Sequence, residues 1–236
     1  MSIGFYRFFT SWTFLCGKLF IICGKLWCSS LLFLRYNINM NKRNFNKNIL
    51  EQVTKAETKY ILNSAKWVMP VSGDFVEMGC YRGDTSVLLA KICGKEKKLY
   101  LYDSFEGLPE KSVFDDSVAG EEFKKGELLV TKAEVVNRFK KSGLVMPVIR
   151  KGFFSTLTPD DLPEKIAFAF LDGDLYESIR DSMRLVVPKM SKDGVILIHD
   201  YMNAALPGVA RAVDEWLKSQ NDVSISVFQT IVKIQF

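Results

Sequence analysis

The chain has 236 residues, of which 48% are hydrophobic and 25% charged, a composition that excludes a disordered protein. Its net charge of +5 is uneven, because the first 50 residues carry seven Lys or Arg and no acid, leaving 25 basic and 27 acidic residues for the other 186. A nearly neutral body excludes an extended nucleic-acid surface, so no nucleic-acid partner is expected.

Residues 1–48 are expected to form an apolar, basic N-terminal arm and linker. Arg7, Lys18 and Lys25 are spaced by 11 and 7 residues, close to whole helical turns, so they share one narrow face of a helix. The longest uncharged run, residues 8–17, is too short to span a bilayer. One interpretation is a helix that contacts a membrane surface through residues 1–36. A packing or dimerisation helix and a targeting segment are the alternatives.

Residues 49–236 alternate between apolar runs and amphipathic segments, which predicts a doubly wound, Rossmann-like α/β sheet. Residues 104–130 interrupt the alternation and are expected to form a binding loop or lid. Helices are expected over residues 49–68, 85–92, 132–141, 176–187 and 208–219. Strands are expected over residues 73–78, 98–102, 146–150, 166–171 and 195–198. Residues 224–235 are expected to add one or two strands, and with two the sheet has seven strands.

The first strand runs into the sequence F-V-E-M-G-C-Y-R-G at residues 75–83. Gly79 and Gly83 let the backbone approach a ligand closely, and the helix that opens near Thr85 (N-capped by Thr85 or Asp84) directs free N–H groups toward it. Glu77 at the strand tip suits a ligand with an ammonium group or hydroxyls, which favours S-adenosylmethionine over NAD. The spacing G-x-x-x-G also lacks the first glycine of the dinucleotide-binding pattern.

Polar residues follow the next two strands as well. Asp103 ends the second strand, where an acid can accept hydrogen bonds from both ribose hydroxyls; a turn or N-cap residue is the alternative. Ser104 and Phe105 follow it directly. Gly152, Phe153, Phe154 and Ser155 follow the third strand, where an adenine could stack on an aromatic ring, although core packing of the two phenylalanines explains the pattern at least as well.

A second polar group follows the strands that end at residues 171 and 198. Asp172, Asp174, His199 and Asp200 would meet there, and carboxylates so close together repel unless a cation lies among them. Oxygen ligands with one imidazole suit Mg²⁺, Mn²⁺ or a related divalent ion. The alternative is a set of solvated turn acids. His199 is the only histidine of the chain.

Several of these segments resemble the macrocin O-methyltransferase family, S-adenosylmethionine-dependent enzymes that methylate sugar hydroxyls. The resemblance runs from about residue 73 to 217 and rests on V-E-M-G-C-Y-R-G (76–83), L-Y-D-S-F-E-G-L-P (101–109), L-D-G-D-L-Y-E-S (171–178), I-H-D-Y (198–201) and P-G-V-A-R-A-V-D-E (207–215). It implies that Glu77, Gly79 and Asp103 hold the methyl donor, that Asp172 and the pair 199–200 bind a metal, and that Asp174 is the general base.

The chain departs from the family at His199, where the usual residue is Asp, so His199 could serve as a ligand or as the base. The expected activity is metal-assisted O-methylation of a sugar or glycosylated small molecule, with Mg²⁺ as the first choice of ion. The alternative is an inactive, membrane-associated scaffold that keeps the methyltransferase fold. A cytoplasmic location, with or without peripheral membrane contact, and a homo-oligomer are further expectations.

Overall fold

The computed structural model describes residues 52–236. The predicted arm of residues 1–48, its membrane-surface helix and the boundary between residues 48 and 49 lie outside the described residues. Within residues 52–236, the helices are all too short or too polar to cross a membrane.

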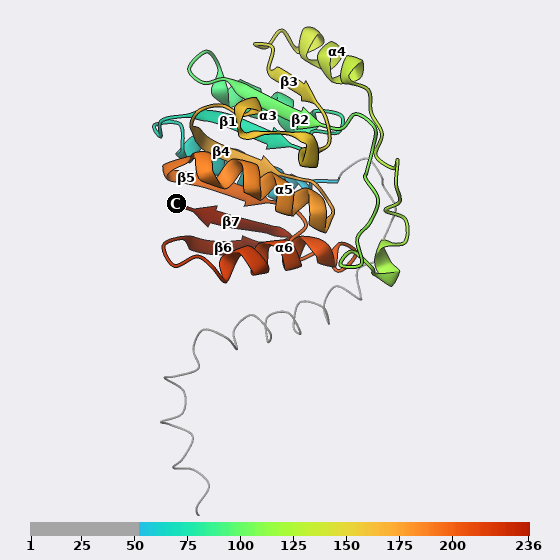
Figure 1. The fold of residues 1–236 in the computed structure, drawn as a ribbon. Helices are drawn as coiled ribbons and strands as arrows, with labels where there is room; N and C mark the ends of the chain where they lie inside the picture. The colour runs from blue at the N-terminus through green and yellow to red at the C-terminus, as the bar shows by residue number, and fades with distance from the viewer. Residues whose placement is uncertain (1–51) are drawn as a thin grey trace, which may run out of the picture. The chain divides into compact units, whose positions relative to one another are not determined.

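Seven strands form a single mixed sheet in the order β3-β2-β1-β4-β5-β7-β6 (Figure 1). Strands β1 to β5 are parallel, and β7 runs antiparallel to both of its neighbours. The predicted doubly wound sheet is therefore confirmed, and its closing segment forms two strands. The strands are β1 (Asp74–Met78), β2 (Leu99–Asp103), β3 (Val148–Lys151), β4 (Ile166–Leu171), β5 (Met190–Ile198), β6 (Ser224–Phe228) and β7 (Ile231–Gln235).

Helices cover both faces of the sheet. Apolar residues of α2 (Lys55–Trp67), α3 (Asp84–Cys93) and α4 (Lys132–Ser142) share one buried cluster with alternate strand residues. Those of α5 (Tyr176–Val186) and α6 (Pro207–Leu217) share the other cluster, and Figure 1 shows both helices lying across one face. Strand β4 is buried along its whole length, as a strand covered on both faces must be. Short 3₁₀ helices occur at Val118–Gly120, Phe154–Thr156, Pro159–Asp161 and Val187–Lys189.

Two helices begin with a capping box, in which a threonine and a glutamate three residues later bond each other's backbone N–H groups. These pairs are Thr54 with Glu57 on α2, and Thr131 with Glu134 on α4. The predicted N-cap of α3, Asp84 or Thr85, is wrong. Gly83 occupies that position in a left-handed conformation and makes no side-chain cap, because the tight turn after β1 leads straight into the helix.

The sheet reverses its strand order between β1 and β4, which is where ligands bind in open α/β sheets. The two strands are tied at this point, since the Asp172 N–H donates to the Met78 carbonyl over 2.8 Å. Gly79 has φ +88°, and a Cβ built on it would lie 1.9 Å from the carbonyl oxygen of Asp172. Only glycine allows this contact.

The loop of residues 104–130 is fastened to the body rather than free. The buried Asp115 accepts a hydrogen bond of 2.7 Å from the Tyr176 N–H, the first residue of α5. A Cβ on Gly120 would lie 2.1 Å from the Ala205 carbonyl oxygen, so the loop also lies directly against the turn that precedes α6. In Figure 1 the loop, drawn in green, runs along the edge where the parallel strands end.

The close contact at Gly79 leads us to expect that an alanine at this position destabilises the protein. Gly79→Ala should lower the free energy of unfolding by about 3–5 kcal/mol, because backbone strain and a steric clash add together. Gly126→Ala is the matched control, since Gly126 has nearly the same φ, +83°, but open space around its Cβ position. It should cost only about 1–2 kcal/mol. Denaturant unfolding measures both, and equal losses would contradict the steric argument.

Candidate active site

The polar residues predicted at the strand ends do gather along one edge of the sheet. Glu77, Asp103, Asp172, His199 and Asp200 lie at the carboxyl ends of β1, β2, β4 and β5. Backbone strain is concentrated in the same region, as it often is at functional sites. Non-glycine residues with positive φ just beyond these four strands are Tyr81, Phe105, Asp174 and Asp200.

A cavity opens at this edge and encloses about 570 Å³ of empty space, part of it open to solvent. Seven of the residues predicted from the sequence line it: Gly79, Asp103, Ser104, Phe153, Phe154, Asp172 and Asp174. The other predicted residues do not: Glu77, Gly83, Thr85, Phe105, Gly152, Ser155, His199 and Asp200. Of these, Gly83 faces α4, since its Cβ position is 3.4 Å from Val135 Cγ1.

Glu77 is 1% exposed, and its Oε2 makes no hydrogen bond within the described residues. Burial, together with the neighbouring carboxylates of Asp172 and Asp103, raises the pKa of Glu77 to about 8. The Ser86 hydroxyl acts in the opposite direction, although it does not reach hydrogen-bond geometry. A buried acceptor without a donor is costly, and a cationic or hydroxyl-bearing ligand would satisfy it.

Asp103 organises the turns around the cavity. Its Oδ2 accepts the N–H groups of Cys80 and Tyr81 at 3.0 Å each, and its Oδ1 accepts that of Phe105 at 2.8 Å. Burial nevertheless leaves the pKa of Asp103 raised. The turn role considered for Asp103 is therefore observed. Because each carboxylate oxygen has two lone pairs, the same group can still accept hydroxyls from the cavity.

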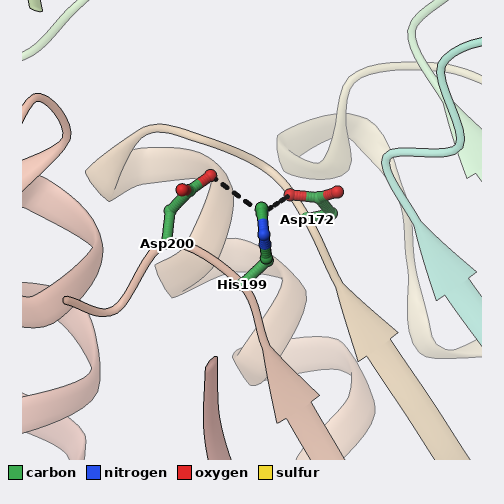
Figure 2. Close-up of side chains that lie close together, drawn as sticks. All are labelled: Asp172, His199 and Asp200. Atoms are coloured by element: carbon green, nitrogen blue, oxygen red, sulfur yellow. Dashed lines mark hydrogen bonds and ion pairs between the residues drawn. The ribbon is translucent and has the colours of Figure 1, made fainter. Parts of the chain in front are cut away.

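His199 lies between two carboxylates at the edge of the cavity (Figure 2). Its Nδ1 is 3.0 Å from Asp172 Oδ1 and 3.0 Å from Asp200 Oδ2. Burial alone would lower the pKa of His199, but Asp200 and Asp172 outweigh it, and the pKa is raised well above its ordinary value. His199 is only 4% exposed. Its ring is thus set behind the cavity rather than in contact with it.

These three residues fit a divalent metal ion. Each offers one ligand atom, and the three atoms lie within 4.8 Å of one another. Ligand atoms that neighbour each other around a six-coordinate ion with bonds of about 2.1 Å are about 3.0 Å apart, close to the observed nitrogen–oxygen distances. Two carboxylates and an imidazole are also ligand types that divalent ions accept.

Asp174 is the acid that faces the cavity beside this cluster. It lines the cavity and has φ +61°. Burial and the charges of Asp172 and Asp200 raise the pKa of Asp174 well above its ordinary value, with partial opposition from His199. A bound cation would reverse much of this repulsion.

Sequence reasoning missed part of the cavity wall. Tyr81 and Gly173 lie inside segments that were already singled out, so their position next to predicted residues was the available signal. The wall contributed by residues 104–130 was predicted only as a whole. The remaining residues of the lining are Gln52, Gly107, Leu108, Pro109, Leu128 and Ser178.

The raised pKa of Glu77 predicts a pH dependence of stability. Between pH 4.5 and about 8 the native state keeps a proton on Glu77 that the unfolded chain releases, so the free energy of unfolding falls as pH rises through this window. Glu77→Gln should remove up to about 1.4 kcal/mol of that fall per pH unit. Denaturant unfolding of both proteins from pH 4.5 to 8 measures the difference. Parallel curves would contradict the assignment.

A family model described as Macrocin-O-methyltransferase (TylF) matches residues 54–231. Demethyldecarbamoylnovobiocin O-methyltransferase of Streptomyces niveus is 32% identical over 157 residues, 62% of this chain and 58% of that protein. Mycinamicin III 3''-O-methyltransferase of Micromonospora griseorubida is 27% identical over 157 residues, 62% of this chain and 61% of that protein. The chain thus spans about three fifths of the length of these curated relatives.

Solved structures of O-methyltransferases superpose on this chain as well. The O-methyltransferase NovP superposes with a TM-score of 0.64 at 26% identity, covering 76% of this chain and 79% of that one. The calicheamicin methyltransferase CalS11 superposes with a TM-score of 0.64 at 16% identity, covering 88% of this chain and 92% of that one, and shows a shared fold. Because the family model spans nearly all of the described residues, this chain belongs to the macrocin-O-methyltransferase family.

Proposed function

We propose that this chain transfers a methyl group from S-adenosylmethionine to a hydroxyl of a sugar or glycosylated small molecule, with help from a divalent metal ion. The activities for which the relatives are named support the reaction and the class of acceptor. The observation that carries the proposal is that one cavity is lined both by Gly79 and Asp103 and by Asp172 and Asp174. A donor half and an acceptor half therefore share one space.

The donor half is formed by the turns after β1, β2 and β3. The backbone at Gly79 admits the donor, Asp103 accepts its hydroxyls, and Glu77 lies beneath as an acceptor for its ammonium group. Ser104 and Phe153 add a hydroxyl and a ring. Phe105 and Gly152 support Asp103, since the Phe105 N–H bonds its carboxylate and the Gly152 N–H bonds its carbonyl at 2.9 Å. The donor, when bound, supplies an electrophilic methyl group on a sulfonium leaving group.

The acceptor half contains the candidate metal ligands Asp172, His199 and Asp200. A divalent ion bound there would supply Lewis-acid stabilisation of the acceptor oxygen. Mg²⁺ was the first choice from the sequence. Imidazole as one of three ligands favours a transition-metal ion over Mg²⁺, so we infer that Mn²⁺ or a similar ion binds at least as well.

Asp174 is the better candidate for the general base. It lines the cavity, whereas His199 is buried and does not. A general base must reach the proton that it removes, directly or through one water molecule. We therefore assign proton removal to Asp174 and metal binding to His199, which separates two roles that the sequence left open.

The loop of residues 104–130 supplies the rest of the wall. Leu108, Pro109 and Leu128 line the cavity with apolar surface, and the anchor at Asp115 holds the loop against α5. An apolar wall limits the access of water to the reacting groups. The scaffold alternative gains no support from the relatives or from the described residues. Cytoplasmic location, membrane contact and oligomerisation remain predictions.

Two aspartate variants test the division between the halves. Asp103→Asn should weaken S-adenosylmethionine binding at least about tenfold, since charge-assisted hydrogen bonds to the donor are lost. Asp172→Asn should leave donor affinity nearly unchanged and lower turnover by about 100-fold or more. Calorimetry measures donor binding, and transfer of a labelled methyl group to a panel of deoxysugar glycosides measures turnover.

The exposed Asp222 provides the control for these variants, and Asp222→Asn should match the wild type in both assays. Absence of donor binding in the wild type would refute the proposed function itself. Undiminished turnover in Asp172→Asn would refute only the metal assistance.

Metal removal gives an independent test. Dialysis against excess EDTA should abolish methyl transfer without changing the affinity for S-adenosylmethionine, because the donor-binding residues are separate from the candidate ligands. Readdition of Mn²⁺ or Mg²⁺ should restore turnover, with Mn²⁺ effective at the lower concentration. Full activity in EDTA would exclude a dissociable metal.

A further inference from the structure

Glu57 is a buried carboxylate behind the candidate metal site, on helix α2. It is 2% exposed, and both of its oxygens accept hydrogen bonds. Oε1 accepts from the N–H and hydroxyl of Thr230, in the turn between β6 and β7, at 3.2 and 2.5 Å. Oε2 accepts from the N–H and hydroxyl of Thr54 at 3.0 and 2.8 Å. The group is therefore held in one orientation.

The same Oε2 is 3.9 Å from Nε2 of His199. The histidine ring thus has carboxylates on both sides, with Asp172 and Asp200 at Nδ1 and Glu57 at Nε2. Phe170 contacts the ring edge-on, with 6.2 Å between ring centroids. The ring orientation is set by contacts on several sides.

The carboxylate of Glu57 is surrounded by hydrogen-bond donors despite its burial. Thr54 and Thr230 donate four hydrogen bonds to its two oxygens, and such donors favour the ionised form of a carboxylate. An ionised carboxylate can only accept hydrogen bonds. It therefore favours a proton on the histidine nitrogen that faces it.

We propose that Glu57 is a positioning residue that keeps the proton of His199 on Nε2 and so leaves Nδ1 as the nitrogen that binds the metal ion. The inference rests on the metal site of the proposed function. A carboxylate behind a metal-binding histidine commonly fixes the orientation of the ring and strengthens its binding to the metal. Here the carboxylate comes from α2, the first helix of the described chain, which packs against β5.

A purely structural role makes a different prediction. Glu57 also completes the capping box of α2, so its loss could act only through a loosened helix. The chain contains a matched case, because Glu134 completes the same kind of box on α4 with Thr131 and has no histidine beside it. Thr54→Ala offers a second comparison, since it breaks the cap of α2 but keeps the carboxylate that faces His199.

The single histidine allows a direct test in the full chain. Nitrogen NMR on protein labelled with ¹⁵N-histidine gives one imidazole, so both ring nitrogens are assigned without ambiguity. On addition of the diamagnetic ion Zn²⁺, Nδ1 should lose its proton and change its shift, while Nε2 should remain protonated. Metal bound through Nε2 would overturn the inference.

Affinity measurements complete the test. Glu57→Gln should weaken Mn²⁺ binding, measured by calorimetry, by about 10- to 100-fold, whereas Glu134→Gln should bind Mn²⁺ like the wild type. Thr54→Ala should lose less Mn²⁺ affinity than Glu57→Gln, because its carboxylate keeps the hydrogen bonds from Thr230. Donor affinity should be unchanged in all three, which shows that each is folded. Unchanged Mn²⁺ affinity in Glu57→Gln, or an equal loss in Thr54→Ala, would overturn the inference and leave the proposed function standing. A wild type whose histidine signals ignore every divalent ion would overturn both. If Glu57→Gln does not fold, the wild-type spectrum alone decides.

Discussion

The contact between Gly79 and the backbone of Asp172 joins the two halves of the candidate site. It lies at the point where the strand order of the sheet reverses, and it brings the first turn, which we assign to the donor, against the strand that carries the candidate metal ligand. Any side chain larger than a hydrogen atom at residue 79 would separate them. In the proposed reaction, this one backbone contact therefore sets the position of the donor's methyl group relative to the acceptor.

Charge is the second constraint on this edge of the sheet. Glu77, Asp103 and Asp174 all have pKa values that burial raises, whereas Glu57 is kept ionised by its donors. The chain offers one imidazole to balance the cluster. The remaining repulsion is a cost to folding that ligands of positive charge would relieve. The excess of buried acids is thus better explained by the binding of positively charged ligands than by a contribution to the stability of the fold.

The fold could be predicted from the sequence to a large extent because its signals are local. The fully apolar run of β4 and the acids that follow each strand predicted both the layers and the edge where the polar groups meet. The predicted start of α2 was wrong, because the helix predicted over residues 49–68 begins only at Lys55, after the capping box of Thr54 and Glu57. The start of α3 depends on a left-handed turn at Gly83, for which the neighbouring Asp84 and Thr85 gave a misleading cap pattern.

What the sequence could not predict depends on tertiary contacts. Glu57 reads as an ordinary helix-capping residue, and only the packing of α2 behind β5 brings it to His199. Whether His199 faces the cavity was likewise undecided, because neighbouring residues at a strand end can point to either side. Phe105 and Gly152 were expected to contact the ligand, whereas their N–H groups instead bond Asp103.

The anchoring of the loop of residues 104–130 divides it into parts whose sequences are constrained to different degrees. Residues 112–120 are tied to α5 and to the turn before α6, and Gly208 leaves room for Asp115, whose Oδ1 would lie 1.9 Å from a Cβ at that position. The stretches on either side, around residues 107–109 and 128, line the cavity, where the proposed acceptor would bind. New acceptor preferences can therefore arise by exchange of these flanking stretches, while the tethered middle section and its glycine partner on α6 must change together or not at all.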